Sequence, residues 1–266
     1  MPVEAFNPVL AGALAGLATW LFTSLGAAAV YLKKEFSRKT LDGLLGFAAG
    51  VMIAASFFSL LLPGLELARP VWGRWSFLPP AAGFLLGALV LRGMDYLIPH
   101  LHAGLNLHDG RPSALPKSFL LIFAITLHNI PEALSVGVAF GAAAIDPELG
   151  VAGAVILMLG IGIQNLPEGM AVSLPLLREG YSRHKAFFIG QLSGVVEPLA
   201  AILGAIVASF AVNMLPWAMG FAAGAMIFVT AEEVIPESHA SGNGDLATMG
   251  LTLGFVLMMC LDVALA

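Results

Sequence analysis

Charged side chains are scarce in this sequence of 266 residues. Asp, Glu, Lys and Arg make up 11% of it, against roughly 25% in soluble domains. This shortage excludes soluble enzyme folds such as a Rossmann domain or a soluble barrel. Cysteine is nearly absent too, since Cys260 is the single one, and this excludes a disulfide framework. The net charge of −5 gives no indication of nucleic-acid binding.

Apolar residues are abundant instead: they make up 59% of the chain, and its mean hydropathy is +0.91. A helix needs about 20 apolar residues to cross a bilayer, so the chain has room for roughly eight such helices in one transmembrane domain, residues 1–266. We therefore predict an all-α membrane protein embedded in lipid. The apolar runs between polar residues give the segments 6–32, 41–66, 77–98, 118–143, 149–177, 184–210, 214–236 and 246–265.

The basic residues predict how these segments are oriented, because short cytoplasmic loops are enriched in Lys and Arg. Ten of the 12 fall in or beside the connections that follow the first, third and fifth segments. Arg69 and Arg74 fall on the other side, after the second segment. This division predicts a multi-pass protein of the cytoplasmic (inner) membrane with both termini outside the cytoplasm.

Two pairs of similar segments indicate an internal repeat. The stretch from Gly46 to Ile53 matches the stretch from Gly220 to Ile227 at seven of eight positions. Between them lie His128-Asn-Ile-Pro-Glu and Gln164-Asn-Leu-Pro-Glu, which are 36 residues apart. From the order of the segments, the two members of each pair run in opposite directions. Inverted repeats with helices broken near the middle of the membrane are typical of secondary transporters.

The second pair gathers polar residues inside apolar helices. His128 and Glu132 lie four residues apart, hence on one helix face, and Gln164 and Glu168 repeat this spacing. Each copy has a proline before its acid, which removes a backbone donor and predicts a kink that frees a carbonyl oxygen. Because a carboxylate is costly inside a bilayer, such residues indicate a functional site. Two antiparallel copies would bring these side chains together at the middle of the membrane.

The side chains expected there suit a divalent metal ion of the zinc type. Imidazole with carboxylate favours Zn²⁺ and related first-row ions, whereas an all-oxygen cage favours Mg²⁺ or Ca²⁺. Asn129 and Asn165 add amide oxygens, and Glu197 lies at a comparable depth on the sixth segment. Met52 on the second segment offers a thioether, although packing alone would also explain a methionine there. We expect a central site for one or two metal ions.

Other polar residues lie near the ends of the segments. Glu66 closes the second segment on the outer side, and Asp95 lies toward the inner end of the third. Glu232 and Glu233 form a consecutive pair inside the apolar run of the seventh segment. The longest connection, between the third and fourth segments, contains His100 and two further histidines, and we expect a flexible tether that attracts metal weakly. Each position has an alternative interpretation as a solvated helix end or an ordinary polar loop.

At these residues the sequence resembles the ZIP (Zrt/Irt-like) family of divalent metal transporters, and within it the prokaryotic GufA-like branch. The resemblance covers the whole chain and rests on the paired HNxPE and QNxPE motifs and the eight segments. It implies a metal site formed by Met52, His128, Asn129, Glu132, Gln164, Asn165, Glu168 and Glu197. It also implies an inner exit region at Asp95, His100, Glu232 and Glu233.

The resemblance further implies how the segments are grouped. The first, fourth, fifth and sixth form a transport bundle beside a scaffold bundle of the second, third, seventh and eighth, and two copies form a homodimer. Two positions depart from the family pattern: Ala133 stands where many relatives have Gly, and Asn165 stands where some have an acid. The second departure argues against a full two-metal site.

The residues and the resemblance together predict a transporter and not an enzyme. We expect it to carry Zn²⁺ into the cytoplasm, with Cd²⁺, Fe²⁺ and Mn²⁺ as alternative cargo, and without ATP, since no nucleotide motif is visible. A metal sensor or a channel with the same ligands is an alternative. An intramembrane metalloprotease would need an HExxH motif, whereas each motif here has at most one histidine beside a proline.

Overall fold

The computed structural model of this protein describes residues 7–32, 36–97, 100–102, 107–109, 117–145, 150–210 and 212–265. Within these ranges the chain is almost entirely helical, and helices cover all eight segments expected from the sequence. The first four segments contain α1 (Pro8–Ala27), α2 (Ala29–Leu32), α3 (Arg38–Ala55), η1 (Ser56–Leu61), α4 (Leu62–Trp72), η2 (Gly73–Trp75), α5 (Leu78–Leu97) and α6 (Lys117–Ile145). The last four contain α7 (Gly150–Arg178), α8 (Arg183–Leu192), α9 (Val196–Phe210), η3 (Val212–Met214), α10 (Leu215–Val229), η4 (Thr230–Val234), α11 (Ile235–His239) and α12 (Gly244–Leu265).

Two short strands lie in the connection between α5 and α6. β1 (His100–His102) and β2 (Leu107–Asp109) pair antiparallel, with His100 opposite Asp109. Apart from these six residues every element of the described chain is helical, so the predicted all-α architecture needs only this small correction. The flexible tether predicted at this place lies largely outside the described residues. Each strand has only three residues, which is too short for an alternating pattern of polar and apolar residues to predict it.

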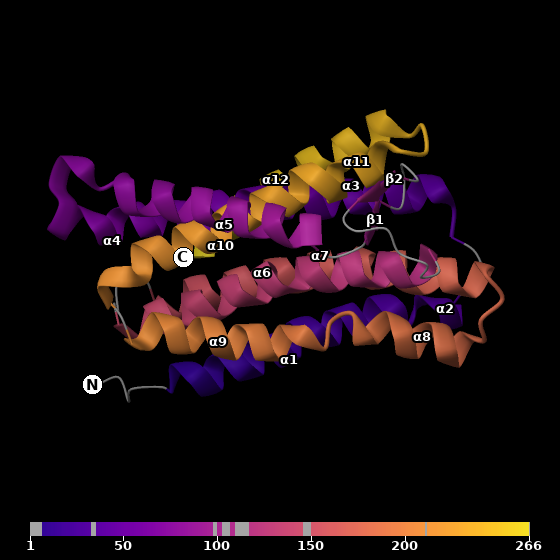
Figure 1. Ribbon diagram of the computed structural model, residues 1–266, viewed down its shortest axis with the longest axis horizontal. Coiled ribbons are helices and arrows are strands. Elements are labelled where there is room, and N and C mark those ends of the chain that lie inside the picture. The colour runs from indigo at the N-terminus through magenta and orange to yellow at the C-terminus, as the bar shows by residue number, and fades with distance from the viewer. Residues whose placement is uncertain are drawn as a thin grey trace.

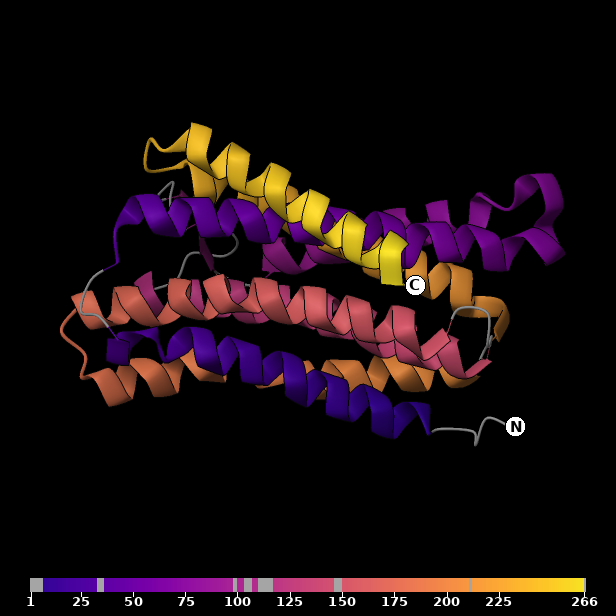
Figure 2. The ribbon, with the colours of Figure 1, turned by 180° about the vertical axis from the view of Figure 1, so that it is seen from behind.

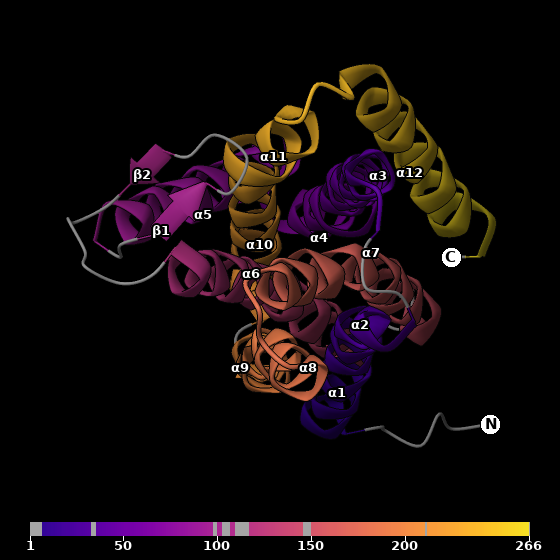
Figure 3. The same ribbon diagram turned by 90° about the vertical axis from the view of Figure 1, so that its right-hand side faces the viewer.

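The helices form two layers (Figure 1). One layer contains α3, α4, α5, α10, α11 and α12, and the other contains α1, α2, α6, α7, α8 and α9, as the end view in Figure 3 shows. Figure 2 shows the layers from behind, with α12 beside α3 and α1 beside α7. Within the layers, α5 also contacts α10, and α9 contacts α1 and α6. The layers meet where α6 contacts α10 and α7 contacts α3.

Glycines of the repeated segment determine how the helices of the first layer pack. Gly46 and Gly50 on α3 lie against the backbone of α12, and Gly220 and Gly224 on α10 lie against the backbone of α5. A Cβ atom at any of the four would overlap a main-chain carbonyl oxygen. Small residues allow this close approach between membrane helices. The two copies of the repeat therefore make equivalent contacts with two different partner helices.

Both copies of the repeat are followed by irregular helix. The π-helix η1 follows α3, the π-helix η4 follows α10, and the second residue after each is a proline, Pro63 and Pro236. By contrast, α6 and α7 continue as α-helix through Pro131 and Pro167, where the sequence predicted kinks. Turns of π-helix are frequent at functional sites. Here both turns of π-helix lie in the layer that faces the two polar motifs of α6 and α7.

Six helices among the described residues are long and apolar enough to cross a membrane. They span Pro8–Leu32, Arg38–Trp75, Val151–Leu177, Arg183–Ser209, Leu215–His239 and Gly244–Ala264. A shorter apolar helix covers Leu78–Met94. These helices make the chain a multi-pass membrane protein.

Candidate metal site

The two polar motifs lie on α6 and α7, which contact each other. Their polar side chains are each at most 7% exposed; they are His128, Asn129, Glu132, Gln164, Asn165 and Glu168. Glu132 lies within electrostatic range of Glu168, and Glu168 lies within range of His128. The two copies of the motif therefore place buried ionisable groups near one another in the protein interior, as the spacing predicted.

Six buried oxygen atoms of these motifs accept no hydrogen bond from the described residues. They are Asn129 Oδ1, Gln164 Oε1 and both carboxylate oxygens of Glu132 and Glu168. The amide nitrogens, by contrast, have partners: Asn129 Nδ2 donates to the carbonyl oxygen of Ser193 at 2.9 Å, and Gln164 Nε2 donates to Asn165 Oδ1 at 2.9 Å. Burying a carboxylate without a partner is strongly unfavourable. A cation bound by these oxygens would compensate that cost.

Glu197 and Asn165 have hydrogen-bond partners of their own. Glu197 is fully buried near the start of α9, where Oε1 accepts from Thr23 Oγ1 at 2.6 Å and Oε2 accepts from Asn165 Nδ2 at 2.9 Å. Asn165 Nδ2 also donates to Thr23 Oγ1 at 3.1 Å. These two predicted ligands therefore belong to a hydrogen-bonded network with α1. Thr23 was missed by the sequence analysis, because a threonine in an apolar helix gives no signal of its own.

His128 contacts the opposite layer of helices. Its Nε2 atom lies 3.2 Å from Oε1 of Glu233 on η4. The family resemblance implied that Glu233 belongs to a separate exit region, but in the structure Glu233 contacts a residue of the central motif. The two layers are thus joined at this point by an imidazole and a carboxylate.

Met52 is fully buried on α3. Its sulfur accepts a hydrogen bond from Thr230 Oγ1 at 3.6 Å, and Thr230 is the first residue of η4. The contact places the thioether at the junction of α3 and η4. Thr230 also donates to the carbonyl oxygen of Met226, the residue that matches Met52 in the second copy of the repeat.

The residues predicted near the ends of the segments lie apart from the central motif or outside the described part. Glu66 is exposed on α4, and Glu232 is half-buried on η4. The side chains of Asp95 and His100 lie outside the described residues. Within the described ranges, no group of three or more His, Cys, Asp or Glu side chains is spaced to hold a metal ion. The predicted ligands are therefore buried without forming a closed coordination shell in this conformation.

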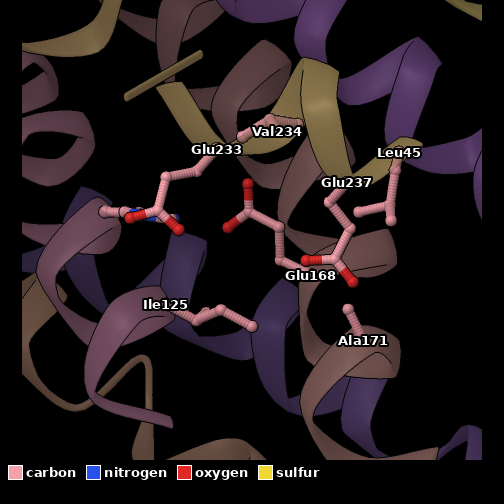
Figure 4. A pocket seen from close by; sticks show the side chains of 8 residues that line it. Leu45, Ile125, Glu168, Ala171, Glu233, Val234 and Glu237 are labelled. Carbon is pink, nitrogen blue, oxygen red and sulfur yellow. The ribbon is translucent and has the colours of Figure 1, made fainter. Parts of the chain in front are cut away.

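A small cavity lies between the two layers (Figure 4). Glu168 of α7 lines it together with His128, Glu233 and Glu237. The cavity can hold one water molecule or one small ion. The volume open to the centre of a water molecule is about 20 Å³. In Figure 4 the side chain of Glu168 lies between those of Glu233 and Glu237.

Three buried or half-buried acids were not predicted from the sequence. Glu237 lies four residues after Glu233, and this spacing was a usable signal that both acids share a helix face. Asp42, near the start of α3, and Asp262, near the end of α12, are buried. Asp262 accepts a hydrogen bond from Ser59 Oγ at 2.5 Å. In the sequence, a lone acid near the end of an apolar segment cannot be told from a solvated helix end.

Comparison with known proteins defines the class to which this site belongs. The family model described as ZIP Zinc transporter matches residues 110–262. The chain is 44% identical to the zinc transporter GufA of Myxococcus xanthus, over 96% of this chain and 99% of the relative. It is 41% identical to the zinc transporter ZIP11 of Xenopus tropicalis, over 99% of each chain, and 41% identical to the zinc transporter ZIPB of Bordetella bronchiseptica, over 95% of this chain and 80% of the relative.

The apolar helices, the buried acids and these relatives together define a multi-pass membrane transporter of metal ions. The chain belongs to the ZIP family of zinc transporters. Because members of this family are transporters, the protein is not an enzyme, and the alternative of an intramembrane metalloprotease is excluded.

Proposed function

We propose that the protein carries Zn²⁺ into the cytoplasm through a site between α6 and α7 formed by Asn129, Glu132, Gln164 and Glu168. The observation that carries this proposal is the set of six buried oxygen atoms on these residues that accept no hydrogen bond from the described residues. Two carboxylates neutralise one divalent cation, and the ion in turn offsets the cost of burying the carboxylates. We therefore expect the empty site to lower the stability of the folded protein and a bound ion to raise it.

The neighbouring side chains support zinc as the cargo. His128 and Met52 offer an imidazole nitrogen and a thioether sulfur, which softer ions prefer to Mg²⁺ or Ca²⁺. His128 reaches the ion by leaving Glu233, and Met52 by leaving Thr230. The relatives are named zinc transporters, which supports the same cargo. Cd²⁺ is expected to compete well for these ligands, and Fe²⁺ and Mn²⁺ less well, because nitrogen and oxygen sites bind them more weakly.

One tight metal position is expected in preference to two. Asn165 is neutral and donates to Glu197, so the carboxylate of Glu197 is already engaged. Glu132, Glu168 and Glu197 together carry three negative charges, which compensate one divalent ion fully but not two. Two divalent ions about 4 Å apart would repel by roughly 16 kcal/mol at an effective dielectric constant of about 20, an upper-end figure.

The proposal includes the arrangement of the chain in the inner membrane. We place eight helices across the membrane, namely the six spans above together with α5 and α6. From the distribution of basic residues, we place both termini outside the cytoplasm. The layer with α1, α6, α7 and α9 would move as the transport bundle, bending at Pro131 and Pro167, beside the other layer as scaffold. The two layers seen in Figure 1 support this grouping, and the family resemblance supports a homodimer.

Zinc uptake into liposomes that contain only this protein tests the proposed function. Saturable uptake by the wild type is expected, and Glu132→Ala and Glu168→Ala should each abolish it, since each change removes half of the compensating charge. Glu179→Ala, which changes an exposed acid after α7, is the matched control and should transport normally. Wild-type rates in a correctly folded Glu132→Ala protein, or linear uptake without saturation, would contradict a carrier with this site.

A further inference from the structure

Arg38 forms an ion pair with Glu237 at one end of the cavity between the layers. Arg38 Nη2 lies 3.6 Å from Glu237 Oε1, whereas Arg38 Nε lies 3.0 Å from Oδ1 of the buried Asp42. Arg38 Nε also donates to Ser241 Oγ at 2.6 Å, and Asn243 Nδ2 donates to Asp42 Oδ2 at 2.8 Å. The charge of Arg38 is therefore shared between two acids, and its contact with Asp42 is the closer one.

Glu237 lines the cavity as well as contacting Arg38. It lies four residues after Glu233, and its charge interacts with those of Arg38, Glu233 and His128. Figure 4 shows Glu168 between Glu233 and Glu237, so three carboxylates from two layers line one small cavity, although among the described residues they are not yet spaced to hold an ion together. His128 contacts Glu233, and Arg38 divides its single positive charge between Asp42 and Glu237, so Arg38 compensates Glu237 only in part.

Glu168 gives a second, independent indication of a cation in this cavity. Its side chain is 4% exposed, and neither of its carboxylate oxygens accepts a hydrogen bond from the described residues. A buried carboxylate in that condition is stabilised by a cation. The same carboxylate belongs to the proposed site between α6 and α7, so an ion that leaves that site for the cavity can keep Glu168 as a ligand.

We propose that Glu237 is a further metal ligand on the cytoplasmic side of the central site, and that Arg38 is a tethered competitor of the metal ion for it. This inference rests on the proposed function. The side chains of Glu168, Glu233 and Glu237 draw together around the departing ion, while Arg38 keeps its contact with Asp42. When the ion leaves, Arg38 pairs with Glu237 again. The competition keeps the affinity of this position low, which favours release.

Zinc titration of the purified protein in lipid nanodiscs tests the inference. Glu132→Gln removes one carboxylate of the central site and leaves the lining of the cavity unchanged. In that background, Glu237→Gln should weaken the remaining zinc binding about tenfold, and Arg38→Gln should strengthen it about three- to tenfold, as expected for one unit charge near a divalent ion. Glu179→Gln is the control for Glu237→Gln, and Lys39→Gln is the control for Arg38→Gln. Each control neutralises an exposed residue with the same charge as its counterpart and should leave the affinity for zinc unchanged.

A double variant separates direct competition from a general effect of charge. Among the described residues, Arg38→Gln leaves the buried Asp42 with Asn243 as its remaining side-chain partner. Arg38→Gln combined with Asp42→Asn removes both charges and keeps the local net charge constant. Direct competition predicts that this double variant still binds zinc more tightly than the Glu132→Gln background. Equal or weaker binding in a folded double variant overturns the role of Arg38.

The outcomes also separate the inference from the proposed function. If wild-type liposomes take up no zinc, the proposed function fails. If they do take up zinc, two results would overturn the inference. The first is that the Glu132→Gln protein binds no zinc. The second is that, in this background, the Glu237→Gln and Arg38→Gln proteins bind zinc with the same affinity as the two controls. Weaker binding in Glu237→Gln together with tighter binding in Arg38→Gln and in the double variant supports it.

Discussion

The Nε2 atom of His128 lies 3.2 Å from a carboxylate oxygen of Glu233, and this contact joins the helix of the HNxPE motif to the opposite layer. A metal ion bound through Nε2 would replace Glu233 or be shared with it. Metal binding is therefore expected to change the contact between the two layers. The contact also links metal binding to the protonation of both residues.

Zinc binding should weaken in acid. Histidine binds metal as the neutral imidazole, and glutamate binds as the carboxylate, so protonation competes with the metal ion. A protonated His128 would in addition be held by Glu233. The apparent Kd for zinc, measured by titration calorimetry, should rise as the pH falls from about 7.5 to about 5.5, the range in which an ordinary histidine titrates. A constant Kd over this range would count against His128 and the two motif acids as ligands.

Glu132→Gln should not destabilise the metal-free protein. The change removes a fully buried carboxylate whose two oxygens accept no hydrogen bond from the described residues, so an unfavourable charge disappears. Wild-type protein should gain about 2.7 kcal/mol of stability when zinc is present at 100 times its Kd, whereas the variant, which binds zinc more weakly, should gain less at the same zinc concentration. Thermal unfolding in detergent with and without zinc measures both effects. A lower unfolding temperature of the metal-free variant would contradict the account.

Asn165→Asp should strengthen a second metal position and weaken the metal-free protein. The substitution replaces a donor to Glu197 with a second carboxylate, which leaves two buried acids facing each other. The loss of that hydrogen bond is expected to cost about 1–3 kcal/mol without metal. Calorimetric counting of zinc ions should show one tight ion in the wild type and a gain at the second position in the variant. Asn213→Asp, at an exposed asparagine, is the control; two equally tight ions in the wild type would refute the argument.

The charge distribution predicts which loops face the cytoplasm. In a Cys260→Ala background, a cysteine at exposed Arg74 should react with a membrane-impermeant thiol reagent added to intact cells. A cysteine at exposed Arg183 should react only after the cells are opened. Mass spectrometry of the labelled protein measures both. The reverse pattern would overturn the assignment of the termini to the outside.

The helical segments and the polar motifs were predictable because both depend on local sequence. Long apolar runs define the helices, and a spacing of four residues places His128 with Glu132, and Gln164 with Glu168, on shared faces. The structure agrees that these side chains are buried. The strands β1 and β2 were not predictable, since three-residue strands carry too little pattern.

The partners of the motif residues were not predictable, because they depend on which helices face one another. Glu233 contacts His128 only because α10, which leads into η4, packs against α6. Asn165 donates to Glu197 only because α1 packs against both α7 and α9. Neither arrangement has a signature along the chain. The π-helices were missed for a different reason: the prolines within the two polar motifs gave a stronger local signal of irregular helix than Pro63, yet α6 and α7 continue as α-helix through them.

Anomalous scattering from crystals of the protein grown with zinc tests the central claim most directly. The account predicts one strong anomalous peak between α6 and α7, within coordination distance of the oxygens of Glu132 and Glu168 and of at least one amide oxygen, from Asn129 or Gln164. A zinc-bound structure whose strong peaks all lie elsewhere, for example beside His100, with none between these two helices, would contradict it.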